Sequence, residues 1–145
     1  LLENEACNEH NIKLVDFRAR SRAAPEKEMI FKAEKLFNNI EYPALIHCKS
    51  GADRAGIMCA LYMLIYKKQD PEIAKKQLSW KYLHIKWAKP GVLDSFVENY
   101  SIDYKKNKIK FMDWAKNKYN PKKLEDSFRS VWWVNRFLDD ILKRE

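Results

Sequence analysis

The sequence predicts an α/β fold in which a parallel sheet is flanked by helices and followed by a helical C-terminal extension. Two short apolar segments, residues 12–17 and 44–48, have the composition of buried strands. Residues 26–37 lie between them and have the apolar content of a helix. Strand, helix and strand in this order are typical of a parallel βαβ unit, which places the loops after Phe17 and Cys48 at one edge of the sheet.

The other segments favour helices. Pro25 and the acidic residues after it open the helix that connects the two predicted strands. Asp70 followed by Pro71 is a strong helix start, because the Asp side chain caps free N–H groups and proline fits the first helical turn. Further helices are predicted over residues 1–10, 56–67, 71–80, 92–100, 111–119, 120–128 and 130–145.

The composition is that of a globular protein. A chain of 145 residues is long enough to bury a core, and we expect residues 1–104 to form the main domain, with residues 105–145 as a helical extension packed on it. The three cysteines have no metal-ligand spacing and suggest no disulfide framework, so a reducing, cytoplasmic compartment is expected. No apolar segment reaches the roughly 18 residues of a membrane span.

The net charge of +8 favours acidic partners. Phosphorylated substrates, anionic membrane surfaces and nucleic acid all qualify as such partners. No nucleic-acid partner is expected, because the chain lacks the combination of aromatic and basic residues that marks a nucleic-acid-binding fold. Docking on a membrane surface is a less favoured alternative, and the sequence does not indicate the oligomeric state.

The stretch HCKSGADR, residues 47–54, joins the second predicted strand to the next helix. In such a loop, successive backbone N–H groups point inward and form an anion-binding nest at the positive end of the helix. The same field stabilises a thiolate, so Cys48 is predicted to be an anionic nucleophile at neutral pH. Arg54 is always charged and can bind two phosphoryl oxygens at once. The competing interpretation, a buried structural cysteine and a surface arginine, does not explain this context.

The stretch HCKSGADRAG resembles the phosphate-binding loop of the cysteine-dependent protein tyrosine and dual-specificity phosphatase superfamily. The resemblance covers residues 1–104 and is closest to compact bacterial members. It implies a phosphomonoester hydrolase that works through a cysteinyl-phosphate intermediate without metal or cofactor, on a phosphorylated protein or a small phosphomonoester. It also implies further strands before residue 1, so the chain is expected to be truncated at its N-terminus.

The same resemblance implies roles for individual residues. Cys48 is the nucleophile, Arg54 binds the phosphoryl group, and His47 orients the loop and tunes the thiol. The phosphate-binding loop consists of Lys49, Ser50, Gly51, Ala52, Asp53 and Arg54.

An acid must protonate the leaving oxygen, because expulsion of an unprotonated alkoxide is slow. Asp16 is the favoured candidate, since it ends the first predicted strand at the same sheet edge as Cys48. Its separation from the cysteine also resembles that of the acid in dual-specificity phosphatases. Asp53 is the alternative. A carboxylate inside the loop would repel a phosphate dianion unless it turned away to bind the loop or a base, yet an Asp just before Arg54 resembles the loops of some phosphoinositide phosphatases.

Three features leave the rate and the substrate open. Most of the superfamily has serine or threonine directly after the arginine, where the hydroxyl assists the second step, whereas this chain has Ala55. A catalytically weak phospho-binding pseudophosphatase is therefore an alternative. Lys49 resembles its counterpart in lipid and inositol phosphatases, so a phosphoinositide or other non-protein substrate is another. Arg18, Arg20 and Arg22 would line one side of an extended loop. They would either attract an acidic or multiply phosphorylated substrate or form a merely solvated basic loop, and the sequence favours neither alternative.

Overall fold

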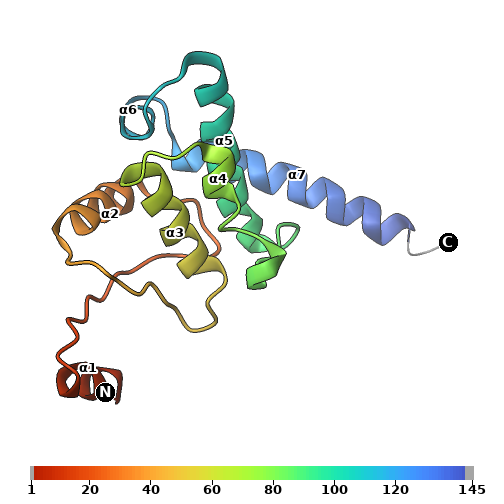
Figure 1. The fold of residues 1–145 in the computed structure, drawn as a ribbon. Coiled ribbons are helices and arrows are strands. Elements are labelled where there is room, and N and C mark those ends of the chain that lie inside the picture. Colours follow the sequence, from red (N-terminus) through yellow and green to blue (C-terminus); the bar gives the residue numbers. More distant parts are fainter. Residues whose placement is uncertain (1, 143–145) are drawn as a thin grey trace.

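The computed structural model describes the backbone of residues 2–142 and the side chains of residues 2–133. Over this part of the chain, all regular structure is helical (Figure 1). Two 3₁₀ turns, η1 (Trp80–Tyr82) and η2 (Lys89–Gly91), precede the long helix α5. The α-helices are α1 (Leu2–Glu9), α2 (Lys27–Asn39), α3 (Asp53–Ile65), α4 (Pro71–Lys75), α5 (Val92–Asn107), α6 (Phe111–Asn117) and α7 (Pro121–Leu142).

The predicted parallel sheet is absent from residues 2–142, and the α/β assignment is wrong for this part of the chain. Residues 12–17 and 44–48 lie outside regular structure and do not form a ladder of backbone hydrogen bonds. Their apolar side chains are largely in solvent, since Ile12 is 59% exposed and Leu45 is 87% exposed. The sequence pattern reports a local preference for extended backbone, whereas a sheet also requires a neighbouring strand as hydrogen-bond partner.

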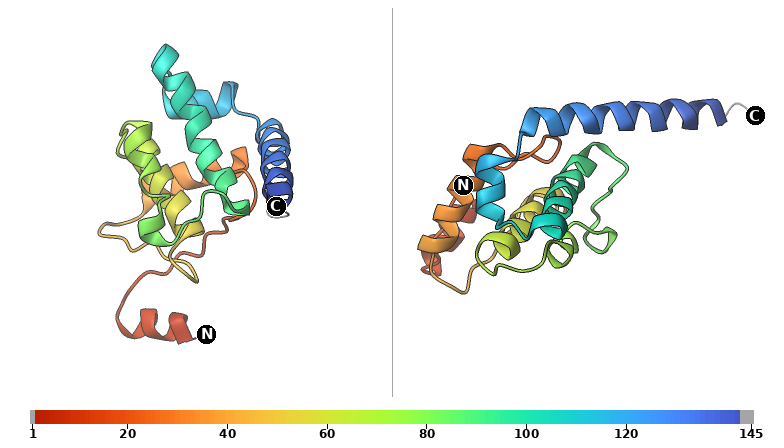
Figure 2. Two further views of the ribbon diagram at one scale, coloured as in Figure 1. Left: turned by 90° about the vertical axis from the view of Figure 1, so that its right-hand side faces the viewer. Right: turned by 90° about the horizontal axis from the view of Figure 1, so that it is seen from above.

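The core forms between helices instead. Helix α3 is apolar around most of its surface and packs against α2, α4 and α6. Helix α5 packs against α4 and α7. The views of Figure 2 show α2 to α6 gathered with the start of α7, while α1 lies apart from them. A helix with an apolar face needs only another apolar face to bury it, so this core needs no sheet. Its largest fully buried side chains include Phe37, Leu61, Phe96 and Trp114.

Helix α4 begins as predicted but is shorter. The Asp70 side chain accepts a hydrogen bond from the Glu72 N–H at 2.9 Å, and Pro71 occupies the first turn. The helix ends at Lys75, and the following turn packs closely on α3. A Cβ atom on Gly56 would lie 2.9 Å from the carbonyl oxygen of Gln77, so only glycine permits this approach without a shift.

The C-terminal segment shares the core of the other helices. Helix α7 then leaves the body (Figures 1 and 2), and Trp133 is 64% exposed. The two helices predicted over residues 120–128 and 130–145 are one continuous helix to residue 142, because no proline or glycine interrupts the sequence after Pro121. No helix within residues 2–142 has the length and apolar character to cross a membrane. The buried residues of this segment are Phe111, Trp114, Ala115, Tyr119 and Leu124.

Candidate active site

The loop after Cys48 turns sharply into helix α3. Residues 49–52 form bends, and Gly51 has a φ of +69°, a left-handed conformation that glycine adopts without steric cost. Helix α3 begins at Asp53, and Arg54 stands in its first turn. The loop therefore folds against the positive N-terminal end of a helix, although residues 44–48, which precede it, form no strand.

The Cys48 sulfur lies among hydrogen-bond donors. Burial alone would raise the pKa of this thiol, but backbone N–H groups and the charge of Arg54 together lower the pKa below its usual range. The side chain is partly exposed, so a substrate can reach it. These surroundings favour a thiolate, the reactive form of cysteine. The three backbone donors are Ser50, Ala55 and Gly51.

Arg54 shares a surface hollow of about 350 Å³ with Arg20 and Arg22, two arginines of the segment before α2. Among the side chains of residues 2–133, no carboxylate forms an ion pair with these three guanidinium groups. Each guanidinium group presents a planar fork of N–H donors that matches a carboxylate or a phosphate. The hollow is therefore suited to an anionic ligand.

The segment before α2 that carries Arg20 and Arg22, here called the arginine segment, is held in place by hydrogen bonds from the C-terminal part of the chain. The N–H of Ala24 donates to Oε1 of Glu125 at 2.9 Å, and the Tyr119 hydroxyl donates to the carbonyl oxygen of Pro25 at 2.8 Å. Ala24 and Pro25 are both buried. Helix α7 and the turn before it thus help to fix the backbone from which Arg20 and Arg22 extend.

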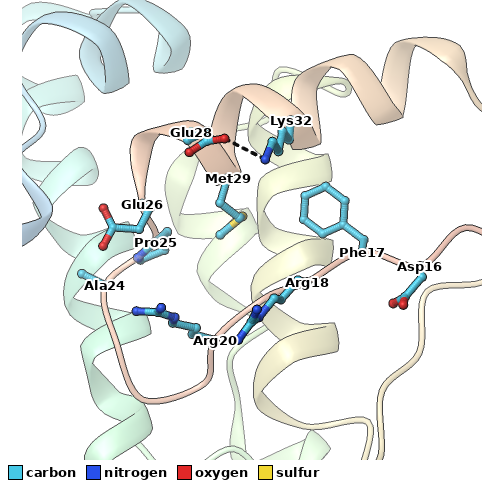
Figure 3. A pocket seen from close by; sticks show the side chains of 10 residues that line it. All are labelled: Asp16, Phe17, Arg18, Arg20, Ala24, Pro25, Glu26, Glu28, Met29 and Lys32. Carbon is cyan, nitrogen blue, oxygen red and sulfur yellow. Dashed lines mark ion pairs between the residues drawn. The ribbon is translucent and has the colours of Figure 1, made fainter.

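Asp16 lines a second hollow, of about 410 Å³, next to the arginine segment (Figure 3). Arg20 lines both hollows, so the depressions of Asp16 and Arg54 are neighbours. Neither Cys48 nor Arg54 lines the hollow of Asp16, and no hydrogen bond or ion pair described within residues 2–133 joins Asp16 to either of them. The other lining residues are Phe17, Arg18, Ala24, Pro25, Glu26, Glu28, Met29 and Lys32.

His47 contacts helix α1. Its Nε2 atom lies 2.6 Å from Oε1 of Glu3, and both side chains are about half exposed. The resemblance implied that this histidine orients the loop, whereas its described partner is a carboxylate of α1. Lys49 and Ser50 are exposed on the loop, and Ala52 is buried just before α3.

Asp53 pairs with a histidine. Its Oδ1 atom lies 2.8 Å from Nδ1 of His84, and Nε2 of that ring lies 2.6 Å from Oδ2 of Asp94. Neither His84 nor Asp94 is predicted from the sequence. The only local signal is that Asp94 stands in the first turn after Pro90 and Gly91, and its contact with the loop through His84 depends on the tertiary fold.

The donors that gather at this site are N–H and guanidinium groups, which bind anions. Within residues 2–133, no group of three or more His, Cys, Asp or Glu side chains is arranged to hold a metal ion.

Comparison with known families places the chain in a phosphatase domain family. A family model described as Swiss Army Knife protein, DSP-PTPase phosphatase domain (PTP-SAK), matches residues 3–93. The match spans more than half of the chain and includes Asp16, the loop from Cys48 to Arg54, and His84. Comparison with curated proteins and with solved structures found no match. The chain therefore belongs to the DSP-PTPase phosphatase domain family, within the dual-specificity phosphatase superfamily.

Proposed function

We propose that this phosphatase domain hydrolyses phosphomonoesters through a phosphorylated Cys48. The observation that supports this most directly is the environment of the Cys48 sulfur, where backbone N–H groups and Arg54 outweigh burial and lower the pKa of the thiol. A nest that stabilises a thiolate also attracts the oxygens of a phosphoryl group, because both are anions. Nucleophile and phosphate site therefore coincide in one loop.

The proposed reaction has two steps. In the first, the Cys48 thiolate attacks phosphorus, so that a P–S bond forms as the P–O bond to the leaving group breaks. Arg54 holds the phosphoryl oxygens while Asp16 gives its proton to the leaving oxygen. In the second, water attacks phosphorus, the P–S bond breaks and Cys48 returns as a thiolate, while Asp16 takes a proton from the water. Ala55 offers no side-chain hydroxyl to the departing sulfur, so the second step is the slower one.

Hydrolysis of p-nitrophenyl phosphate in EDTA and a reductant tests this proposal. In a second assay, the reductant is removed and the protein is treated with iodoacetamide, with and without inorganic phosphate as protectant, before activity is measured. We expect hydrolysis to persist in EDTA, to be lost when Cys48 is alkylated, and to be protected by phosphate. Hydrolysis that survives complete alkylation of Cys48 would contradict the proposal. Protection by phosphate without any hydrolysis would identify a phospho-binding domain instead.

Asp16→Asn tests the proposed acid. We expect kcat/KM, which reports the first step, to fall by about 10²-fold or more for a phosphoserine peptide, because its alkoxide leaving group needs a proton. The loss for p-nitrophenyl phosphate should be much smaller, since p-nitrophenolate leaves without protonation. Asp113→Asn on α6, another exposed carboxylate, is the matched control. Equal losses on both substrates, or this leaving-group dependence in Asp53→Asn instead, would contradict the assignment.

The arginine hollow indicates a substrate with a second anionic group near the reacting phosphate. The double variant Arg20→Gln, Arg22→Gln should raise KM for a doubly phosphorylated peptide by roughly five- to tenfold, a magnitude typical of two exposed ion pairs. KM for p-nitrophenyl phosphate should rise less, because its single phosphate is bound by the loop and Arg54. The matched control is Lys122→Gln, Lys123→Gln on α7. A rise that is equal for both substrates would refute this preference.

A further inference from the structure

A buried histidine connects the N-terminal turns of two helices. Asp53 is the first residue of α3 and Asp94 stands in the first turn of α5, and His84 lies between them with contacts of 2.8 Å and 2.6 Å. His84 and Asp94 are each only 2% exposed, whereas Asp53 is partly open to solvent. Nothing in the proposed reaction uses this chain of three groups, yet it ends on the residue next to Arg54.

The backbone between η1 and α5 is shaped to place this histidine. A Cβ atom on Gly91 would lie 1.8 Å from the carbonyl oxygen of Lys86, so the segment after His84 can close on itself only with glycine there. Lys86 in turn pairs with Glu98 of α5 at 2.8 Å. The ring of His84 is thus fixed by its backbone as well as by its two carboxylate partners.

The chemistry of the contacts makes the ring an imidazolium. Ionised carboxylates only accept hydrogen bonds, so both ring nitrogens must donate to satisfy Asp53 and Asp94 together. Burial disfavours the charge, but the hydrogen bonds and charges of Asp94 and Asp53 outweigh burial and raise the pKa of His84 above its usual range. These two carboxylates are the charged groups that α5 and α3 direct at the ring. Lys86 lies near enough to Asp94 to interact with its charge.

We infer that His84, held by Asp94, is a positioning residue that keeps the Asp53 carboxylate turned away from the phosphate site. The inference rests on the proposed function of the Cys48 loop. A carboxylate freed from His84 could pair with the adjacent Arg54, which has no carboxylate partner among the described side chains, and would then compete with phosphate for that guanidinium group. Its negative charge would also repel a phosphate dianion in the loop.

The sign of the pH dependence follows from the raised pKa. We call the hydrogen bonds of His84 to Asp53 and Asp94 the clamp. The clamp is complete while His84 is protonated. It weakens as the pH rises through the raised pKa of the ring, because a neutral imidazole can donate to only one of the two carboxylates. Phosphate binding should therefore lose affinity on the alkaline side in the Cys48→Ser protein, which keeps His84 but has no thiol charge at the site. A variant without an ionisable group at position 84 should lack this loss.

A double-mutant cycle tests the inference, with inorganic phosphate as the probe. Binding is measured by calorimetry in the Cys48→Ser background, so that neither turnover nor the thiol charge contributes. His84→Gln should weaken phosphate binding by about tenfold, the order expected for the loss of a charge-assisted hydrogen bond. Addition of Asp53→Asn should restore the affinity to within about twofold of the parent, because a neutral amide does not compete for Arg54. His10→Gln, an exposed histidine, is the control and should leave the affinity unchanged.

The outcomes separate positioning from a purely structural role. The inference is supported if Asp53→Asn restores phosphate affinity in the His84→Gln protein and if the His84→Gln protein no longer loses phosphate affinity on the alkaline side. Unchanged affinity in His84→Gln, or a double variant as weak as the single one, would overturn it. If His84→Gln does not fold, Asp94→Asn loosens the same clamp and must show the same rescue. Because phosphate binding needs no turnover, failure of the cysteinyl-phosphate mechanism would leave this result intact.

Discussion

Replacing Cys48 with serine is expected to reduce hydrolysis of p-nitrophenyl phosphate by about 10³-fold or more, because the variant retains binding groups but no activated nucleophile. The loop's N–H donors and Arg54 favour an anionic sulfur at this position. A serine hydroxyl has a far higher intrinsic pKa, so the same field does not ionise it at neutral pH. Steady-state kinetics with both proteins under identical reducing conditions measure the difference.

Cys59→Ser is the matched control, because it makes the same exchange in helix α3. Burial raises the pKa of Cys59, in contrast to the lowered pKa of Cys48, so this variant should retain hydrolysis. Reaction with iodoacetamide should likewise continue to lower pH at Cys48 than at Cys59. Activity that is undiminished in Cys48→Ser, or equally reduced in Cys59→Ser, would contradict the assignment of the nucleophile.

Substitution of Arg54 is expected to have the next largest effect. Arg54→Ala should lower kcat by about 10³-fold, the scale on which a transition-state arginine contributes to phosphoryl transfer. Arg54→Lys should recover only part of this loss, because lysine supplies the charge without the planar fork that binds two oxygens. The effect should appear more in kcat than in KM, since the contact strengthens as charge spreads over the phosphoryl oxygens.

Arg129→Lys provides the comparison for Arg54→Lys. Arg129 is an exposed arginine of α7 that pairs with Glu125, so its replacement tests the loss of a surface guanidinium group outside the Cys48 loop. We expect it to leave kcat unchanged. If Arg54→Lys were as active as the parent protein, Arg54 would serve only as a positive charge and the proposed bidentate contact would be wrong.

The helices were predictable because their signals are local. The capping side chain of Asp70 and the apolar content of α3 act within a few residues, and each gave a helix close to where it was expected. Strands were not predictable in this way, because extended segments such as 44–48 need a distant partner strand that no local pattern supplies. For α7, two helices were predicted over residues 120–128 and 130–145, whereas the absence of proline and glycine after Pro121 keeps the helix continuous.

In the candidate site, too, the features that depend on neighbouring residues were predictable and those that depend on the tertiary fold were not. The loop from Cys48 to Arg54 is contiguous in sequence, so its turn, its glycine and its helix start could be read together. The contact of Asp53 with His84 could not be predicted from the sequence, because it joins residues 31 positions apart through the packing of three elements. Asp16 remains a prediction, since the structure places it in a neighbouring hollow without a direct contact to Cys48.

Detection of a phosphorylated Cys48 tests the central claim most directly. The protein is mixed with excess p-nitrophenyl phosphate, quenched within the first turnover and mapped by peptide mass spectrometry. We predict one phosphoryl group on the peptide that contains Cys48, and accumulation of this species because Ala55 slows its breakdown. Phosphate release without any phosphorylated Cys48, or a phosphoryl group on another residue, would contradict the proposed mechanism.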